Sequence, residues 1–506
     1  MTETPRRIED LADELISAIL SFLLPAESSS STSSPVNPPD LSPALSGRPA
    51  HVYGEQFELD RFRLVCKRFC RISTPRKFRS FVLRFERRGF QRLGELVQMQ
   101  LACHVRFFTY MVRPFYQGSG WSQLFTKIAS NEPSAVQIHR ARLQDQLSIV
   151  KSDHDSELLQ KAIIAFSSLQ QVKLLRLQDE ADERLLDQIR ERLLEGKLAL
   201  DWEEACVRAV TNLGISLLAS NCTSVSFVGP QISPEATVRL LQTPSTTLSA
   251  LGARLTCLDV TFHSKADLTS HMELLSDVFR DFFLAAKNLT TLHLGFATGA
   301  PLKLSLDYVF HRIQWKKLST LSIQGWRLTS QEIIALIRRH RRQLRDIRLV
   351  GVYIRDGGRW RDVLSVLHDE MDEIEHIDLR GINYADSVSG FNGSNGHGNG
   401  HGNSNGNGVH HAPFPLSIIV NHSLPNSPPA PSPPPSFHQV VLNTDHLAFA
   451  SRGHTRHPSN SPELERLRRK TVDELGDDGM SVTHEQSQVW EKWVLSSPRR
   501  VARRRH

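Results

Sequence analysis

A short phrase of apolar residues recurs along the middle of the chain, and it constrains the fold more than any other feature. Its clearest copies run from Leu318 to Ile323 and from Leu344 to Leu349. Each copy has an apolar residue, two others, an apolar residue, one other and an apolar residue. The last two apolar residues lie two positions apart, so on a β-strand their side chains face the same way. The phrase therefore predicts a series of strands, each with one buried face.

Further copies flank this pair, over 255–260, 289–294 and 374–379, with weaker copies over 169–174 and 222–227. The copies that begin between Leu255 and Ile374 start about 26–34 residues apart. A helix-like pattern follows these copies; one begins with the capping-box pair Thr329 and Glu332. A leucine-rich repeat has about 20–29 residues, and the region resembles that family. We predict an α/β fold with a leucine-rich-repeat-like βα solenoid over 81–382. The alternative is a set of unrelated βα units in an ordinary sheet.

The residues between the apolar positions of each phrase would lie on the face of the strands that points away from the helices. Most are polar: Thr290, His293, Thr320, Ser322, Gln324, Arg345, Arg348, His376 and Asp378. A broad polar surface of this kind suits recognition of another protein. The substrate-binding residues themselves stay unknown at this point.

Composition narrows the class of protein. The 506 residues carry a net charge of +7, too modest an excess to predict nucleic-acid binding. The six cysteines form no C-x-x-C pair, so we predict no metal site and no cofactor. No apolar run reaches about 18 residues, and the N-terminal residues lack the pattern of a secretory signal. We expect no membrane association and a location in the cytoplasm, the nucleus or both.

Two amphipathic helices are predicted near the N-terminus. The first covers about 11–23 and the second about 59–72, where Phe62, Val65, Phe69 and Ile72 share a face. Between them lies a stretch rich in Ser, Pro and Gly, which predicts a disordered insert at about 25–56. Two helices this short with apolar residues on more than one face must dock on another surface.

These residues resemble an F-box. That motif begins Leu-Pro-x-Glu-Leu, continues with Ile and Leu at helical spacing, and has a Val-Cys-Lys/Arg-x-Trp segment in its next helix, where Phe69 stands at the aromatic position. The matching positions are Leu11, Glu14, Leu15, Ile19, Leu23, Leu64, Val65, Cys66, Lys67 and Phe69. Ala12 replaces the usual Pro, and an insert of roughly thirty residues splits the motif, which costs little because loop-closure entropy grows slowly with length. The resemblance covers residues 8–80.

The resemblance implies a function. Leu11, Glu14, Leu15, Ile19, Leu23, Leu64, Val65, Cys66 and Phe69 would bind a Skp-type linker protein and, through it, a cullin. The repeats would hold an unknown protein substrate for ubiquitination by other subunits.

The chain after Ile382 changes in composition. Residues 383–506 are predicted to be a low-complexity, mostly disordered tail with a Gly/Asn/His stretch, a proline run and an arginine-rich end. Arg499, Arg500 and 503–505 resemble a nuclear localisation or nucleic-acid tail, or serve only solubility. Trp490 and Trp493 indicate a short docking motif or a terminal cap.

Patterns typical of catalysis are missing from the sequence: it has no Walker loop, no H-E-x-x-H and no G-x-S-x-G. We therefore predict no catalytic residues and no enzyme. The predicted function is a substrate-recognition adaptor of a cullin–RING (SCF-type) ubiquitin ligase. The alternatives are a leucine-rich-repeat scaffold whose N-terminal helices only cap the solenoid, and a nuclear protein that binds nucleic acid through Arg338, Arg339, Arg341, Arg342 and the C-terminal arginines.

Overall fold

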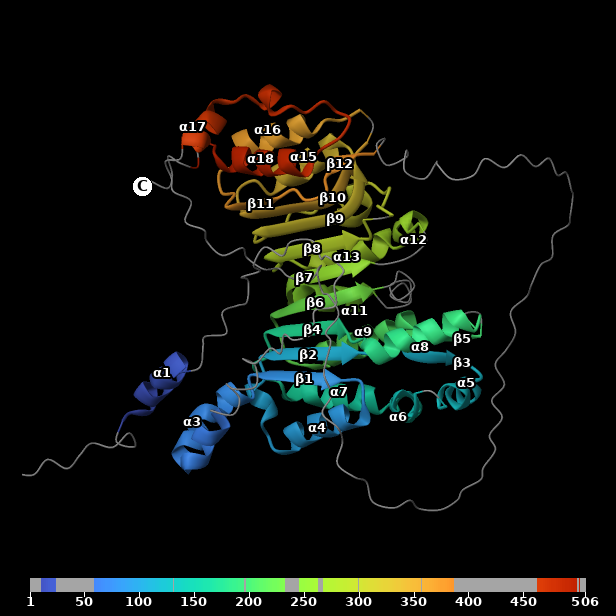
Figure 1. The fold of residues 1–506 in the computed structure, drawn as a ribbon. Coiled ribbons are helices and arrows are strands. Elements are labelled where there is room, and N and C mark those ends of the chain that lie inside the picture. Colours follow the sequence, from blue (N-terminus) through green and yellow to red (C-terminus); the bar gives the residue numbers. More distant parts are fainter. Residues whose placement is uncertain are drawn as a thin grey trace, which may run out of the picture.

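One β-sheet runs through the molecule from the N-terminal helices to the C-terminal ones (Figure 1). The structure is a computed structural model that describes residues 11–23, 59–130, 132–194, 197–232, 245–262, 267–298, 300–355, 357–385, 462–497 and 500. The sheet has ten strands in the order β1-β2-β4-β6-β7-β8-β9-β10-β11, with β12 beside β10. Every pairing in it is parallel.

The strands follow one another across the sheet in chain order. They are β1 (Ser80–Arg84), β2 (Phe107–Val112), β4 (Gln171–Arg176), β6 (Val225–Ile232), β7 (Leu255–Phe262), β8 (Thr291–Phe296), β9 (Thr320–Leu328), β10 (Asp346–Ile354), β11 (His376–Asp378) and β12 (Asn383–Tyr384). Because the order never reverses, the sheet has no switch point of the kind where doubly wound folds bind small ligands.

Helices cover one face of the sheet. They are α4 (Arg87–Gln98), α7 (His154–Ala165), α9 (Trp202–Ala219), α11 (Ser245–Arg254), α13 (Ser276–Ala285), α14 (Leu306–Phe310), α15 (Ser330–Arg339) and α16 (Trp360–Asp369), with the shorter η2 (Ala102–His104) and α12 (Thr269–Leu274) between strands. The predicted capping box at the start of α15 is confirmed: Thr329 accepts from the backbone of Glu332, and the Glu332 carboxylate accepts in return.

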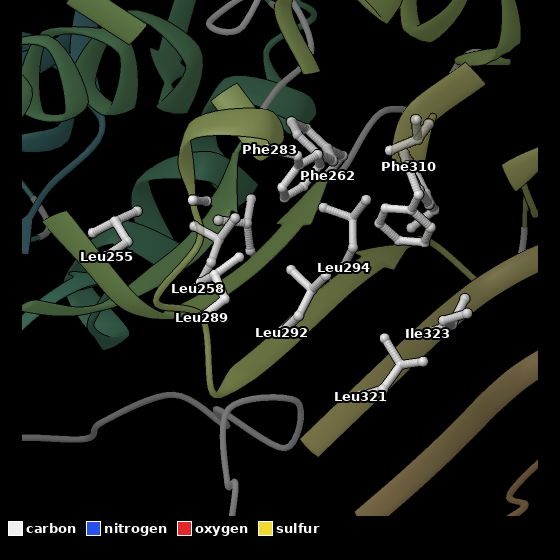
Figure 2. Packing of buried hydrophobic residues seen from close by; sticks show 14 of the residues in the cluster. Leu255, Leu258, Phe262, Phe283, Leu289, Leu292, Leu294, Phe310, Leu321 and Ile323 are labelled. Atoms are coloured by element: carbon white, nitrogen blue, oxygen red, sulfur yellow. The ribbon is translucent and has the colours of Figure 1, made fainter. Parts of the chain in front are cut away.

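The core lies between the sheet and these helices. Figure 2 shows Leu258, Leu292 and Leu321 in register on β7, β8 and β9, all with side chains toward the helices. Farther along the same strands, Phe262 stacks on Phe296, with ring centroids 5.5 Å apart. These residues belong to one continuous apolar cluster that reaches from β1 to the C-terminal helices.

An insert extends from the sheet beyond the carboxyl end of β2. It contains β3 (Phe115–Gly118), α5 (Trp121–Ile128), α6 (Pro133–Ser152), α8 (Glu180–Glu191) and β5 (Leu198–Asp201). β3 and β5 form a separate antiparallel pair. The insert has an apolar cluster of its own, which includes Trp121, Phe125 and Leu185.

The C-terminal helices cover the far end of the sheet. α17 (Pro462–Arg469), η5 (Val472–Leu475) and α18 (His484–Leu495) lie beside α16, at the opposite end from α1 and α3 (Figure 1). Trp490 is fully buried and donates from Nε1 to the Leu475 carbonyl, 3.1 Å away. Arg500, 5% exposed, donates to the carbonyls of Met371 at 2.9 Å and Val494 at 2.7 Å. The sequence predicted a mostly disordered tail over 383–506; within it, these helices pack on the sheet.

The predicted architecture, a short helical unit followed by a leucine-rich-repeat-like solenoid, is wrong as a description of this fold. The structure is α/β around one large parallel sheet, as in the alternative of βα units in an ordinary sheet. The phrase reports only where strands lie, and all seven copies overlap strands of the sheet. It says nothing of the connections, which range from the short α14 to the whole insert.

Candidate partner-docking site

Helix α1 (Asp13–Leu23) has apolar residues on two sides. Ile16 and Leu20, four positions apart, are 1% and 3% exposed. Leu15 and Ile19, also four apart, are 54% and 36% exposed. Positions four apart lie on one face of a helix, so one apolar stripe packs inside the chain and the other faces outward.

The second segment is helical over 59–65 and continues, after a break at Cys66, as α3 (Lys67–Lys77). Cys66 is the N-cap of α3, where its sulfur accepts from the backbone N–H of Phe69 at 3.4 Å. Phe69 is 2% exposed and stacks on Phe62, with ring centroids 4.4 Å apart. Leu64 and Val65, just before the break, are 84% and 59% exposed.

A cluster of polar contacts joins the two segments across 55 or more residues of sequence. The Asp13 carboxylate accepts from Arg68 Nε at 2.6 Å and from Arg71 Nη2 at 2.7 Å. Hydrogen bonding to Arg68, with its charge, lowers the pKa of Asp13 below its ordinary value. Arg76 donates to the Ser17 carbonyl near the middle of α1. Because the start of α1 meets the start of α3, the two helices run in the same direction.

We call residues 11–23 and 59–77 the N-terminal helical unit, and it is coupled directly to the sheet. α3 ends at Lys77 and β1 begins at Ser80, so only Phe78 and Arg79 connect them. The Phe78 ring packs at the edge of the main core, and Arg63 lies over it at 5.0 Å. Arg79 lies over the Phe107 ring of β2, also at 5.0 Å. The unit is thus held against the edge of the sheet.

The structure gives different environments to the residues predicted to bind a linker protein. Leu15, Ile19, Leu64 and Val65 are exposed apolar side chains. Glu14 is exposed, Leu11 and Cys66 are half-buried, and Phe69 is buried within the unit. Leu23 ends α1, and its side chain lies outside the described residues. The four exposed apolar residues, which we call the apolar face, come from both segments of the unit.

The second candidate surface lies on the sheet. Asp259, His293, Ser322, Arg348 and Asp378 are neighbours in register on β7 to β11, and we call them the polar row. Each alternates with core residues of its strand, so the row lies on the face opposite the helices. The sequence predicted all of these positions as outward-facing except Asp259.

The contacts within the polar row are uneven. His293 Nδ1 and Ser322 Oγ are 2.7 Å apart. His293 Nε2 is 3.9 Å from Asp259 Oδ1, which is too long for a hydrogen bond, and 3.4 Å from Thr261 Oγ1. Both carboxylate oxygens of Asp259 are buried without a hydrogen-bond partner. Burial therefore raises the pKa of Asp259 to about 7, although the charge of Arg348 acts in the opposite direction.

The sequence contains a signal for Asp259 that we missed. The strand reads Leu258-Asp259-Val260-Thr261-Phe262, so a carboxylate lies in the middle of an apolar run. A charged residue is rarely buried on such a strand unless it is paired. The alternation of the strand is compatible with an outward-facing Asp259, but only the register with β8 places it beside His293.

A buried ionic cluster joins the insert to the sheet. Asp182, with 2% of its side chain exposed, accepts from Arg142 Nη1 at 2.6 Å and Arg113 Nη1 at 3.0 Å. Burial acts to raise the pKa of Asp179, but hydrogen bonds and charge from Arg142 outweigh it and lower the pKa to about 2. Two arginines thus face two aspartates. Since the charges of this cluster already balance, we interpret the cluster as a structural contact that holds the insert against the sheet.

Within the described residues, no group of three or more His, Cys, Asp or Glu side chains is placed to hold a metal ion. No helix in that part of the chain is long and apolar enough to cross a membrane. No protein-family model and no curated protein matches the chain.

Proposed function

We propose that this chain is a substrate-recognition adaptor of a cullin–RING ubiquitin ligase, and that it acts in the cytoplasm, the nucleus or both. The N-terminal helical unit binds a Skp-type linker protein through its apolar face. The outer face of the sheet holds a protein substrate. The chain performs no chemistry itself; it raises the effective concentration of the substrate beside the conjugating enzyme.

One observation supports this proposal most. Leu15, Ile19, Leu64 and Val65 remain exposed although Ile16, Leu20 and Phe69 of the same unit are buried. Large apolar side chains left exposed on a small helical unit indicate a protein interface. The F-box resemblance includes these four residues, and it implies a Skp-type linker as the partner.

The coupling of the unit to the sheet also fits an adaptor. A two-residue connection and the rings of Phe78 and Phe107 hold the unit in place. An adaptor must present its substrate at a defined position relative to the linker, and a rigid connection allows this better than a flexible one.

The test is a binding titration of the full chain with a purified Skp-type linker protein. Leu15→Asp and Val65→Asp should each weaken binding by at least about 30-fold, since a charge placed in an apolar interface removes a contact of about 2 kcal/mol or more. Leu147→Asp is the matched control. Leu147 lies on α6, outside the N-terminal helical unit, and its side chain is 55% exposed, a fraction similar to the 54% of Leu15. This variant should bind the linker as the unmodified chain does.

Other outcomes separate the alternatives. If the unmodified chain does not bind the linker, or if Leu15→Asp and Val65→Asp bind equally well, the adaptor proposal is wrong. If the unit only caps the sheet, Leu15→Asp should leave linker binding unchanged.

The alternative of nucleic-acid binding depends on several arginines, and two of these arginines already have partners in the chain. Arg338 pairs with Glu370, and Arg500 donates to buried carbonyls.

A further inference from the structure

Asp259 is the most unusual group in the polar row. Its side chain is 1% exposed, and neither oxygen has a hydrogen-bond partner. An unpaired buried carboxylate is costly, because it loses hydration and gains nothing in return. Its neighbours in register are Val228 on β6, which offers no donor, and His293 on β8, whose Nε2 is 3.9 Å away. The chain itself leaves this carboxylate uncompensated.

The groups around Asp259 are the imidazole of His293 and the two hydroxyls that contact it. Thr261 Oγ1 and Ser322 Oγ lie on the same face of the sheet. Gly295, in register with Thr261, lets these groups pack closely: a Cβ there would lie 2.9 Å from Thr261 Oγ1 and 3.1 Å from His293 Nε2, too close for an ordinary contact. Thr291 and Thr320 lie two residues before His293 and Ser322 on the same strands, and both are only half-buried. A side chain that reaches Asp259 from outside would pass over these threonines.

We propose that Asp259 anchors a binding site for a cationic side chain, a lysine or an arginine, of the protein substrate. The inference rests on the proposed function, because it assigns the outer face of the sheet to the substrate. It adds the chemistry of what that face recognises. The site consists of the Asp259 carboxylate with the hydroxyl of Thr261 on the same strand.

Other ligands, an anionic side chain or a metal ion, fit this site less well than a cationic side chain does. Ammonium and guanidinium groups only donate hydrogen bonds, and Asp259 supplies an acceptor that the chain does not use. An anionic residue would face this carboxylate, while the nearest arginine of the row, Arg348, is already paired with Asp346 at 2.8 Å. A metal ion needs more ligands than one carboxylate and one imidazole.

The test uses a phage-displayed library of random 12-residue peptides, selected on the unmodified full chain. Peptides that bind should share a lysine or arginine at one position. Replacing that residue by its neutral isostere, norleucine for lysine or citrulline for arginine, should weaken binding at least tenfold. In the Asp259→Asn chain the same replacement should change binding less than twofold, because the carboxylate that interacts with the cation is absent.

Asp378→Asn is the matched control. Asp378 lies in the same row, on β11, and is paired with Arg380 at 2.8 Å. This variant should keep the preference for a cation. Thermal unfolding of both variants shows whether they fold as the unmodified chain does. Selected peptides without a shared cation would overturn the proposal. So would a cation preference that Asp259→Asn retains.

The pH dependence of peptide binding gives a second readout. The charged or titratable groups that face Asp259 are Cys257 on its own strand, His293 on β8 and Arg348 on β10, whereas β6 presents Val228. Deprotonation of Asp259 favours a cation, so affinity should rise between pH 6 and pH 8. This rise should persist in His293→Gln and vanish in Asp259→Asn. A rise of equal size in Asp259→Asn would overturn the assignment to this carboxylate. Linker binding is measured separately, so either proposal can fail without the other.

Discussion

At the scale of single residues, Asp259 carries an electrostatic penalty that depends on pH. Burial raises its pKa from the ordinary value of 3.8 to about 7. The folded state therefore holds this proton more tightly than the unfolded chain does. The resulting stabilisation is fully present below pH of about 4 and is lost as the pH rises through about 7.

Asp259→Asn should relieve that penalty. At pH 8 we expect the free energy of unfolding to rise by roughly 2–4 kcal/mol, since each pKa unit corresponds to about 1.4 kcal/mol and the buried amide keeps part of the cost. At pH 4 the change should stay within about 0.5 kcal/mol, because Asp259 is then protonated. Urea unfolding followed by circular dichroism at both pH values measures this. An equal effect at pH 4 and pH 8 would show that Asp259 does not ionise in this range.

The same penalty connects stability to recognition. A carboxylate that destabilises the free chain above pH 7 is neutralised when a partner's cation binds to it. Functional groups of this kind are kept although a neutral residue would stabilise the fold. Asp259→Asn should therefore make the chain more stable and its peptide binding weaker, a combination that a purely structural residue would not give.

The N-terminal helical unit shows what residue patterns can and cannot predict. Helical spacing predicted one apolar set that contains Leu15, Ile16, Ile19 and Leu20, and of these Leu15 and Ile19 are exposed. The adjacent Ile16 and Leu20 are buried instead. The choice between the two stripes depends on how α3 lies against α1, where Arg68 donates to Asp13. That contact spans 55 residues and leaves no periodic signal in the sequence.

At the scale of elements, α8 is fixed to the sheet by its first turn. Asp182→Ala should lower the free energy of unfolding by about 3–5 kcal/mol, because it leaves the half-buried guanidinium of Arg142 without one of its two carboxylates. Asp187→Ala on the same helix is the control. Its pair with Arg190 has side chains 61% and 60% exposed, so the loss should stay below about 0.5 kcal/mol. Urea unfolding of both variants measures the difference, and similar values would mean that the cluster does not lock the insert.

The C-terminal helices offer a second test at this scale. Trp490→Ala should destabilise the chain by about 3–5 kcal/mol, since it empties a fully buried site between α18 and η5. Val489→Ala, one residue earlier and 38% exposed, should cost less than about 1 kcal/mol. Thermal unfolding of the two full-length variants distinguishes a packed terminal helix from one that only lies nearby. Equal midpoints would contradict the packing described for α18.

The strands of the main sheet were easier to predict from the sequence than the insert and the C-terminal helices. Seven copies of one phrase lie on β4 and β6 to β11, because alternating burial leaves a two-residue period. The antiparallel pair of β3 and β5 has no such pattern and forms only when segments 80 residues apart meet. Trp490 and Trp493 did stand out in a polar tail, and the structure buries both.

At the scale of the whole molecule, the overall architecture was the part that local patterns could not supply. A repeated strand phrase is compatible with similar units stacked in series and with one continuous sheet that has unequal connections. The deciding features are connection lengths and the insert between β2 and β6, which apolar spacing does not encode. Strand order follows chain order throughout, so each strand contacts mainly its neighbours in sequence.

This arrangement predicts a gradient of local stability that hydrogen exchange can measure. Amides of β7, β8 and β9 have a hydrogen-bonded strand on both sides and a core beneath them, so they should exchange most slowly. Amides of α1 should exchange fastest among the described helices, since polar contacts and one apolar stripe alone hold it to α3. Adding a Skp-type linker protein should slow exchange in α1 and around Val65 while β8 stays unchanged. If α1 were already as protected as β8 in the free chain, its apolar face would not be available, and the docking role of the N-terminal helical unit would be wrong.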